Sequence, residues 1–592
     1  MLASAVGALI ALVCVGIIKL LILFGLIGSV STEGSAKTLN AKDAFLKIDL
    51  TKPMSERTPS DLTALFDAGS AVGFADLVRA IDAAAEDQNI KGIYLYFGPE
   101  YPHSWGRSEE LRQALTRFSD SGKPVLAYSD SYTQQGYFVA SIADSIYLNP
   151  GGGLDFRGLG AEVLYYKELL DKLEVKMSLI RPKSNDYKSA GETYTMNHMS
   201  DANRRQIREY IVSIWDYVVD QIAEARDIPA AELNRIADNL DAFLPEDAVK
   251  NRLIDRTGFE SDVCKAMKET FGAKATVALG DYVQTLNRKA EQKERIAIIY
   301  AEGDVQTGKG FGRGVYSDMI TKALDDAAKD EKIKAIVLRI NSPGGAVIAS
   351  ETMTDAVRRA KTKKPVVVSM GDVAASAGYE MSCYADYIVA EPTTITGSIG
   401  VFAILPEVGG TLRKYLGITT DTVKTNANAT ALSLLRPASP RASELLQQNV
   451  EDFYTVFVGR VAEGRKLEYN YVDSIARGRV WTGREALKLG LVDALGGLDD
   501  AVAVAAERAK IENYHVVDYP SNKDILTELK ESKESTSTLT VQSGEALQGL
   551  PSALPVAGDG VWVPGEVMRG LLDPLLDCRG LQARVPFFIL TD

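Results

Sequence analysis

Hydrophobic and polar positions follow two alternating patterns along the chain. Short apolar runs rich in β-branched residues, at 295–303, 333–342 and 365–370, predict buried strands. The segments between them, 317–330 and 349–362, place apolar residues three and four positions apart, which predicts amphipathic helices. Strands that alternate with helices of this length are typical of βαβ units, so we expect an α/β fold with mostly parallel sheets.

The same order of segments occurs twice. Three stretches of the first half match three stretches of the second half at an offset that stays near 240 residues: Ala80–Phe97 with Ala323–Ile340, Gly136–Pro150 with Gly378–Pro392, and Glu246–Gly258 with Arg484–Gly496. One register held over three segments indicates two copies of one domain. We place the copies at residues 41–286 and 295–517, with a charged linker at 287–294 between them.

Both ends of the chain differ from the repeats. Residues Leu2–Val30 are apolar apart from Lys19 and are long enough to cross a bilayer core of about 30 Å. The run is too long for a cleaved signal peptide and has no basic start, so we predict an uncleaved transmembrane anchor over residues 1–31. Residues 518–592 form a tail that we predict to be partly disordered. Its apolar last segment, 561–590, is expected to dock on a surface.

Charge and composition exclude several classes of function. The net charge of −13 argues against a nucleic-acid partner. Four widely spaced cysteines and three histidines form no metal-binding or disulfide pattern, so we expect neither a metal nor a cofactor.

Comparison of the repeats singles out one serine and one lysine. Ser376 stands where a strand should turn into a helix, predicted at 377–386, and the matching position of the first copy is Gln134. Lys188 of the first copy matches approximately Ala431 of the second. Each copy lacks what the other has, so the halves make one complete site if they pack with Ser376 facing Lys188.

Four stretches carry a resemblance to a known family: Arg339–Glu351, Ser369–Tyr379, Pro392–Phe402 and Asp186–Glu192. Here the sequence resembles the signal peptide peptidase A (protease IV) family in its long, two-domain form, from the anchor to about residue 517. The nucleophile motif reads Ser-Ala-Gly-Tyr, where Ser-Gly-Gly-Tyr is familiar, and the tail after residue 520 has no counterpart.

The resemblance implies a membrane-anchored Ser-Lys protease with the fold of the caseinolytic protease and crotonase superfamily. By motif position, Ser376 is the nucleophile, Lys188 is the general base and the Ser398 hydroxyl orients the lysine. The resemblance also implies cleaved signal peptides as substrates, a single-pass protein of the inner membrane with periplasmic catalytic domains, and a ring-like homotetramer.

The chemistry requires these residue types independently. Lysine accepts a proton only when neutral, so its pKa must fall from about 10.4 to roughly 7–8, which burial achieves. A carboxylate beside Lys188 would oppose this, and we expect Glu192 to point away to solvent. The backbone N–H groups of Gly344, Gly345 and Ala377 are candidate donors to the oxyanion of an acyl intermediate.

Two alternatives remain open at this stage. Crotonase-like acyl-CoA chemistry shares the fold and the glycine-rich loop but needs no Ser-Lys pair split between repeats. A catalytically inactive membrane scaffold needs neither side chain.

Overall fold

The computed structural model describes residues 41–58, 72–286, 294–310 and 314–520, together with three short strands at 553–555, 562–564 and 581–584. The predicted anchor, nearly all of the predicted linker and most of the predicted tail lie outside these residues. Within them, no helix is both long enough and apolar enough to cross a membrane.

The first half of the chain builds one six-stranded parallel sheet, with the strand order β6-β4-β3-β2-β1-β7. Residues of α2, α3 and α4 pack on one face of this sheet and residues of α10 on the other, because successive strand residues point to opposite faces. The elements are β1 (Ala44–Asp49), α2 (Phe74–Glu86), β2 (Ile90–Phe97), α3 (Trp105–Ser119), β3 (Val125–Ser129), α4 (Gln134–Ala140), β4 (Ser145–Leu148), α8 (Ala230–Asn239), α9 (Pro245–Lys250), β6 (Arg256–Thr257), α10 (Glu260–Glu269), β7 (Ala275–Ala278) and α11 (Leu279–Leu286).

The second half builds a second sheet, with the order β17-β15-β13-β11-β8-β19; β14 also pairs with β13, and β18 with β14. Helices α12 and α13 pack on one face and α19 on the other. The elements are β8 (Arg295–Glu302), α12 (Ser317–Lys329), β11 (Ile333–Ser342), α13 (Val347–Lys361), β13 (Val366–Ala375), α14 (Ala377–Glu380), β14 (Tyr387–Ala390), β15 (Ile395–Gly397), α17 (Tyr469–Ile475), β17 (Val480–Thr482), α18 (Gly483–Lys488), β18 (Ala494–Leu495), α19 (Leu498–Ala509) and β19 (His515–Asp518).

The two sheets repeat one strand order. The path β6-β4-β3-β2-β1-β7 of the first sheet corresponds strand by strand to β18-β14-β13-β11-β8-β19 of the second, and every pairing on both paths is parallel. The predicted α/β fold with parallel sheets is therefore confirmed.

A third, mixed sheet joins the two halves, with the order β10-β9-β12-β22-β16-β5. In it β5 of the first half pairs antiparallel with β16 of the second half. Its strands are β5 (Lys176–Ile180), β9 (Val305–Gln306), β10 (Val315–Tyr316), β12 (Gly344–Ala346), β16 (Phe402–Glu407) and β22 (Leu581–Arg584), and the short helices near it are α5 (Lys167–Lys172), α6 (Glu192–Thr195) and α15 (Gly409–Leu416). β20 (Ala553–Pro555) and β21 (Trp562–Pro564) form a separate pair.

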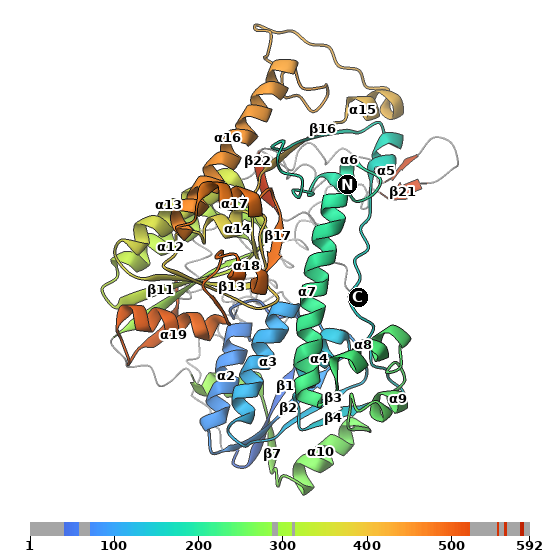
Figure 1. The fold of residues 1–592 in the computed structure, drawn as a ribbon, viewed down its shortest axis with the longest axis vertical. Coiled ribbons are helices and arrows are strands. Elements are labelled where there is room, and N and C mark those ends of the chain that lie inside the picture. The colour runs from blue at the N-terminus through green and yellow to red at the C-terminus, as the bar shows by residue number, and fades with distance from the viewer. Residues whose placement is uncertain are drawn as a thin grey trace, which may run out of the picture.

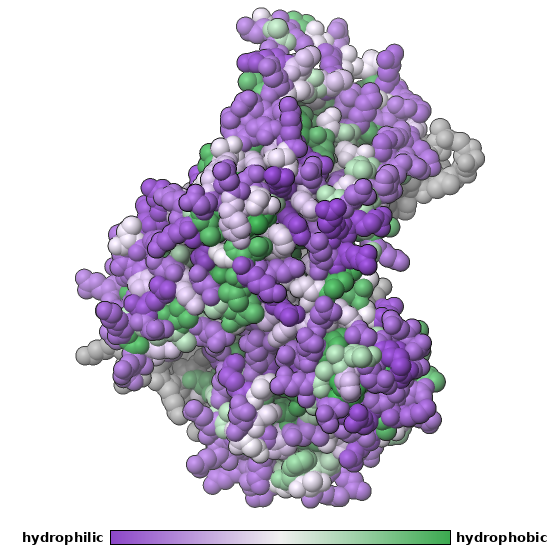
Figure 2. Space-filling view, in the orientation of Figure 1, coloured by the Kyte–Doolittle hydropathy of each residue, from purple (hydrophilic) through white to green (hydrophobic). Residues whose placement is uncertain are grey.

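Two 26-residue helices extend from the sheets, as Figure 1 shows: α7 (Asp201–Arg226) and α16 (Pro440–Arg465). Each begins after a serine whose hydroxyl accepts a hydrogen bond from the backbone of the first turn. The face seen in Figure 2 is mainly hydrophilic, with hydrophobic residues in scattered small groups. The apolar sides of the helices therefore face mainly the sheets, where they are buried.

One predicted helix is much shorter than expected. The segment 377–386 is helical only over α14, and residues 381–384 form turns. The chain has to reverse there, because β14 enters the sheet beside β13 and Asp386 Oδ2 accepts a hydrogen bond from the N–H of Val366 at the start of β13.

Candidate active site

Ser376 lies at the junction between β13 and α14, as predicted. It has φ 59° and ψ −117°, which is an uncommon conformation for a residue with a side chain. Its N–H donates to the carbonyl of Gly397 at 2.8 Å, and its hydroxyl lies 3.4 Å from the carbonyl oxygen of Gly400. These contacts hold a strained backbone in place and direct the hydroxyl away from the helix.

Lys188 reaches this serine from the other half of the chain. It lies in the loop between β5 and α6, and both side chains are fully buried. The distance between Lys188 Nζ and Ser376 Oγ is 2.8 Å, which is a hydrogen bond. The two residues that the repeat comparison singled out are therefore in direct contact.

Ser398 completes the cluster. Its hydroxyl lies 2.9 Å and its carbonyl oxygen 3.1 Å from Lys188 Nζ. Ser398 has φ 49°, and its N–H donates to the carbonyl of Arg479 at 2.7 Å. The turn before β16 thus presents two oxygen acceptors to the amine.

Burial lowers the pKa of Lys188 well below its ordinary value of 10.5, because the charged form loses its hydration. Glu192, which we expected at the solvent, is instead buried, with Ser200 donating to its carboxylate at 2.7 Å and Arg181 lying 3.7 Å away. That expectation was wrong, because the start of α7 folds over this carboxylate.

A loop that the sequence did not single out holds the lysine in place. The N–H of Tyr187 donates to the carbonyl of Arg477, and Gly478 lies directly against Lys188. A Cβ on Gly478 would come within 2.5 Å of Lys188 Cβ, and its φ of 78° also favours glycine. Gly478 stands alone between Arg477 and Arg479, and nothing in this part of the sequence indicates a contact with Lys188.

The glycines of β12 differ in their surroundings. Gly345 has φ 155°, and a Cβ there would lie 2.2 Å from the carbonyl oxygen of Val305, so only glycine fits. The N–H of Gly344 donates to Ser342 Oγ at 3.2 Å. Gly344, Gly345 and Ala377, the first residue of α14, all remain candidate oxyanion donors, and of these the N–H of Gly344 already has an acceptor within the chain.

Asn185 is a further buried polar residue near the dyad that the sequence did not single out. Its side chain is fully buried, and neither amide atom has a hydrogen-bond partner among the described residues. A Cβ on Gly400 would lie 2.8 Å from Asn185 Nδ2. In the sequence, only the position of Asn185 three residues before Lys188 pointed to a place near the site.

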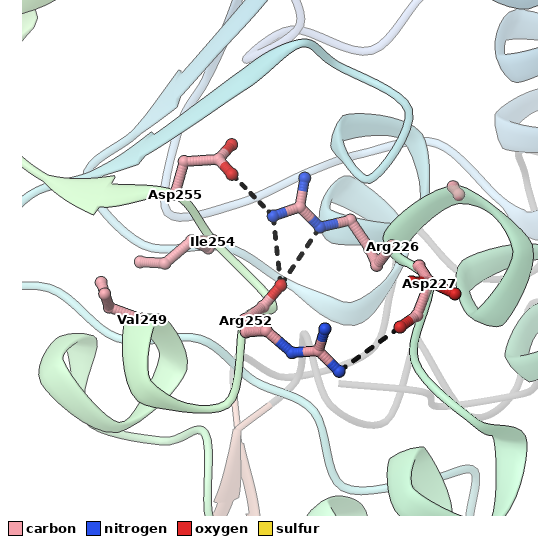
Figure 3. A pocket seen from close by; sticks show the side chains of 7 residues that line it. Arg226, Asp227, Val249, Arg252, Ile254 and Asp255 are labelled. Carbon is pink, nitrogen blue, oxygen red and sulfur yellow. Dashed lines mark hydrogen bonds and ion pairs between the residues drawn. The ribbon is translucent and has the colours of Figure 1, made fainter.

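A cavity of about 410 Å³ lies elsewhere, at the last turn of α7 (Figure 3). Its charged groups satisfy one another: Arg226 pairs with Asp255 at 2.8 Å and donates to the carbonyl of Arg252. Gln206, near the start of α7, contacts the carbonyl of Tyr187 beside the lysine. The cavity lies at the opposite end of this helix, which is about 39 Å long at 1.5 Å per residue. We therefore do not assign the site to this cavity.

Comparison with known proteins identifies the family of the chain. The model of peptidase family S49 matches residues 117–274 and 358–512, and the Clp protease model matches residues 287–388. Protease 4 of Salmonella typhi is 37% identical over 516 residues, which cover 84% of this chain and 82% of that protein. Protease 4 of Haemophilus influenzae is 35% identical, over 73% of this chain and 72% of that protein.

A putative signal peptide peptidase SppA of Enterococcus faecium is 32% identical over 246 residues, which are 40% of this chain and 70% of that protein. The family model matches segments in both halves of the chain, which include β3, β4 and β6 of the first parallel sheet and β13, β14 and β15 of the second. The chain belongs to peptidase family S49.

Proposed function

We propose that this member of peptidase family S49 is a serine endopeptidase in which Ser376 is the nucleophile and Lys188 the general base. The observation that carries the proposal is the 2.8 Å contact between a fully buried lysine amine and a serine hydroxyl. A nucleophile and a base within hydrogen-bond reach, with the base oriented by a third group, are the arrangement that covalent catalysis requires. The surviving pair argues against an inactive scaffold, and membership of a peptidase family argues against crotonase chemistry.

The contacts of Lys188 orient its lone pair. A neutral amine has two N–H groups and one lone pair. If the two N–H groups donate to the hydroxyl and the carbonyl of Ser398, the lone pair faces Ser376 Oγ. Lys188 then takes the hydroxyl proton while Oγ attacks the peptide carbonyl, and it returns that proton to the leaving amine.

The acyl-enzyme is then hydrolysed: Lys188 accepts a proton from the attacking water and passes it to Ser376 Oγ as the acyl bond to that oxygen breaks. In both steps the negative charge on the substrate oxygen needs nearby donors, and we assign this role to the N–H groups of Gly345 and Ala377. Both residues are buried and lie on the two segments that flank the nucleophile.

We extend the proposal to substrate and location. The relative named as a signal peptide peptidase favours cleaved signal peptides and similar apolar peptides as substrates. The apolar stretch Leu2–Val30 supports a single-pass anchor in the inner membrane, which would hold the periplasmic catalytic domains close to such peptides. The homotetramer expected from the family resemblance belongs to the same proposal.

Active-site labelling tests the assignment of the nucleophile. A fluorophosphonate probe added to the full chain in detergent should modify Ser376, as located by peptide mass spectrometry. The Lys188→Ala variant should be labelled far more slowly, because its serine has no base. Degradation of a synthetic signal peptide by the unlabelled enzyme should stop when labelling is complete. Full activity after stoichiometric labelling, or a label on a different serine, would exclude Ser376.

The pH dependence of kcat/KM tests the role of the lysine. Because burial lowers the pKa of Lys188, activity should rise with pH through a pKa well below 10.5, as the amine loses its proton. Lys188→Arg should be inactive at every accessible pH, since arginine remains charged. An active Lys188→Arg variant would show that the side chain acts only through its positive charge.

A further inference from the structure

One side chain of α7, Gln206, lies against both chain neighbours of the general base. It is 1% exposed, so its amide is shielded from solvent. Gln206 Nε2 lies 3.0 Å from the carbonyl oxygen of Tyr187 and 3.0 Å from Ser189 Oγ. Tyr187 and Ser189 stand directly before and after Lys188 in the sequence. A single amide group therefore contacts the chain on either side of the lysine.

The other end of this amide faces the second half of the chain. Helix α7 belongs to the first half but passes beside β17 of the second (Figure 1). There the N–H of Val480 donates to Gln206 Oε1 at 3.4 Å. Val480 is paired with Gly397 in the antiparallel ladder of β17 and β15, and the carbonyl of Gly397 accepts the N–H of Ser376 at 2.8 Å. Gln206 thus touches the segment of the base directly and is linked to the nucleophile through one pair of strand residues.

Asn203, one turn earlier on α7, fixes the orientation of the amide. Asn203 Oδ1 accepts hydrogen bonds from Ser189 Oγ at 2.9 Å and from Gln206 Nε2 at 3.1 Å. Asn203 is 4% exposed and Ser189 is 1% exposed, so the whole network is buried. Buried polar groups are costly to leave without a partner, so these side chains resist any movement that breaks their hydrogen bonds. The network therefore holds the chain beside Lys188 in one position.

We propose that Gln206 is a positioning residue for the dyad, which holds the chain on both sides of Lys188 against the second half so that the amine stays buried beside Ser376. The proposal rests on the assignment of Lys188 as the general base. Gln206 acts through the lysine and contacts neither Ser376 nor the candidate oxyanion donors among its hydrogen bonds. Its loss should therefore affect the chemical step more than the binding of substrate.

The enclosure of Lys188 keeps its amine neutral. Charged side chains that approach its segment form ion pairs with one another: Arg181 with Glu192, Arg479 with Glu209 and Arg477 with Asp473. Arg205 of α7 donates to the hydroxyl of Tyr187. Burial is the cause of the lowered pKa of Lys188. A loosened segment would let water reach the amine and would raise this pKa toward its ordinary value.

Gln206→Leu in the full-length chain tests the proposal, because it removes the amide and keeps a side chain of similar size. For a short fluorogenic peptide, kcat should fall roughly a hundredfold, the loss expected when a reacting group moves by about 1 Å, while KM changes less than about twofold. The rise of kcat/KM with pH should move upward by about one pH unit. Rates are expressed per serine labelled by the fluorophosphonate probe at completion, so that unfolded molecules are not counted.

Gln221→Leu is the matched control. It makes the same substitution about 22 Å farther along α7, at 1.5 Å per residue. It should keep the kcat and the pH profile of the unmodified chain. A loss of folded protein alone lowers the rate equally at every pH and leaves the pH profile in place. An unmoved pH profile for Gln206→Leu would therefore overturn the proposal.

Ser189→Ala tests the same network even where Gln206→Leu does not fold. It removes one contact of the amide and leaves those with Tyr187 and Val480. The pH profile should move in the same direction as for Gln206→Leu, by a smaller amount. A profile identical to that of the unmodified chain would refute the proposal.

A double variant tests whether Gln206 acts through the lysine. Lys188→Ala combined with Gln206→Leu should be labelled by the probe no more slowly than Lys188→Ala alone, because the group that Gln206 positions is already absent. A further loss in the double variant would contradict this route. A wrong nucleophile gives a different result, because Ser376→Ala would then hydrolyse the fluorogenic peptide at the unmodified rate.

Discussion

Ser376→Ala and Lys188→Ala should each lower kcat for peptide hydrolysis roughly 10⁴-fold or more, and the double variant should lose no more than either single variant. The two side chains form one buried unit with an Nζ–Oγ distance of 2.8 Å. Without the hydroxyl there is no acyl-enzyme, and without the amine the hydroxyl keeps its proton. Residual activity would come from the oxyanion donors and from substrate binding alone. Initial rates on a fluorogenic peptide with purified variants measure the effect.

Two variants separate this loss from general damage to the fold. Ser382→Ala removes another fully buried serine of the same region, whose hydroxyl donates to the carbonyl of Gly378, and Lys183→Ala removes an exposed lysine of the same loop. Both should retain activity close to that of the unmodified enzyme. Additive losses in the double variant would show that the serine and the lysine act independently, which the dyad does not allow.

Arg339→Met should lower the free energy of unfolding by about 3–5 kcal/mol, because it takes a charged partner away from two buried carboxylates. Arg339 is 1% exposed on β11 and donates to two carboxylates of the first half, Glu56 at 3.0 Å and Glu110 at 2.6 Å. Its third partner is the hydroxyl of Ser369 at 2.9 Å. This cluster lies between the two halves, so its loss should loosen the packing that brings Lys188 to Ser376.

The charges of this cluster also predict how stability depends on pH. Burial alone would raise the pKa of Glu56, but the nearby charges of Arg339 and Arg107 lower it to about 2. A depressed carboxyl pKa contributes stability that is complete above the ordinary value of 4.5 and is lost as the pH falls toward 2.

Urea unfolding at neutral pH and at pH 3 measures both effects. The control is Arg359→Met, which removes the half-exposed ion pairs of Arg359 with Asp325 and Asp355 and should cost less than about 1 kcal/mol. Equal losses for the Arg339 and Arg359 variants would contradict a special role for the buried cluster.

The local pattern of apolar and polar residues was sufficient to predict most of the helices and strands and to select the candidate site residues. The run 333–342 is strand β11 over the same residues, and the predicted helices 317–330 and 349–362 correspond to α12 and α13. These predictions succeed because apolar periodicity reports directly on which side of a strand or helix meets the core. Ser376 and Lys188 could be selected because each repeat lacks one partner, which is information carried by the sequence itself.

Packing between the halves decided the features that depend on distant segments. The sequence does not show that Gly478 lies against Lys188, or that the start of α7 buries Glu192. Nor could it show that β22 pairs with β12 and β16, because an antiparallel ladder is specified by backbone groups that every residue shares. The lowered pKa of Lys188 belongs to this group as well. It arises from the desolvation of the amine once the two halves enclose it, and no property of residues 186–192 alone produces it.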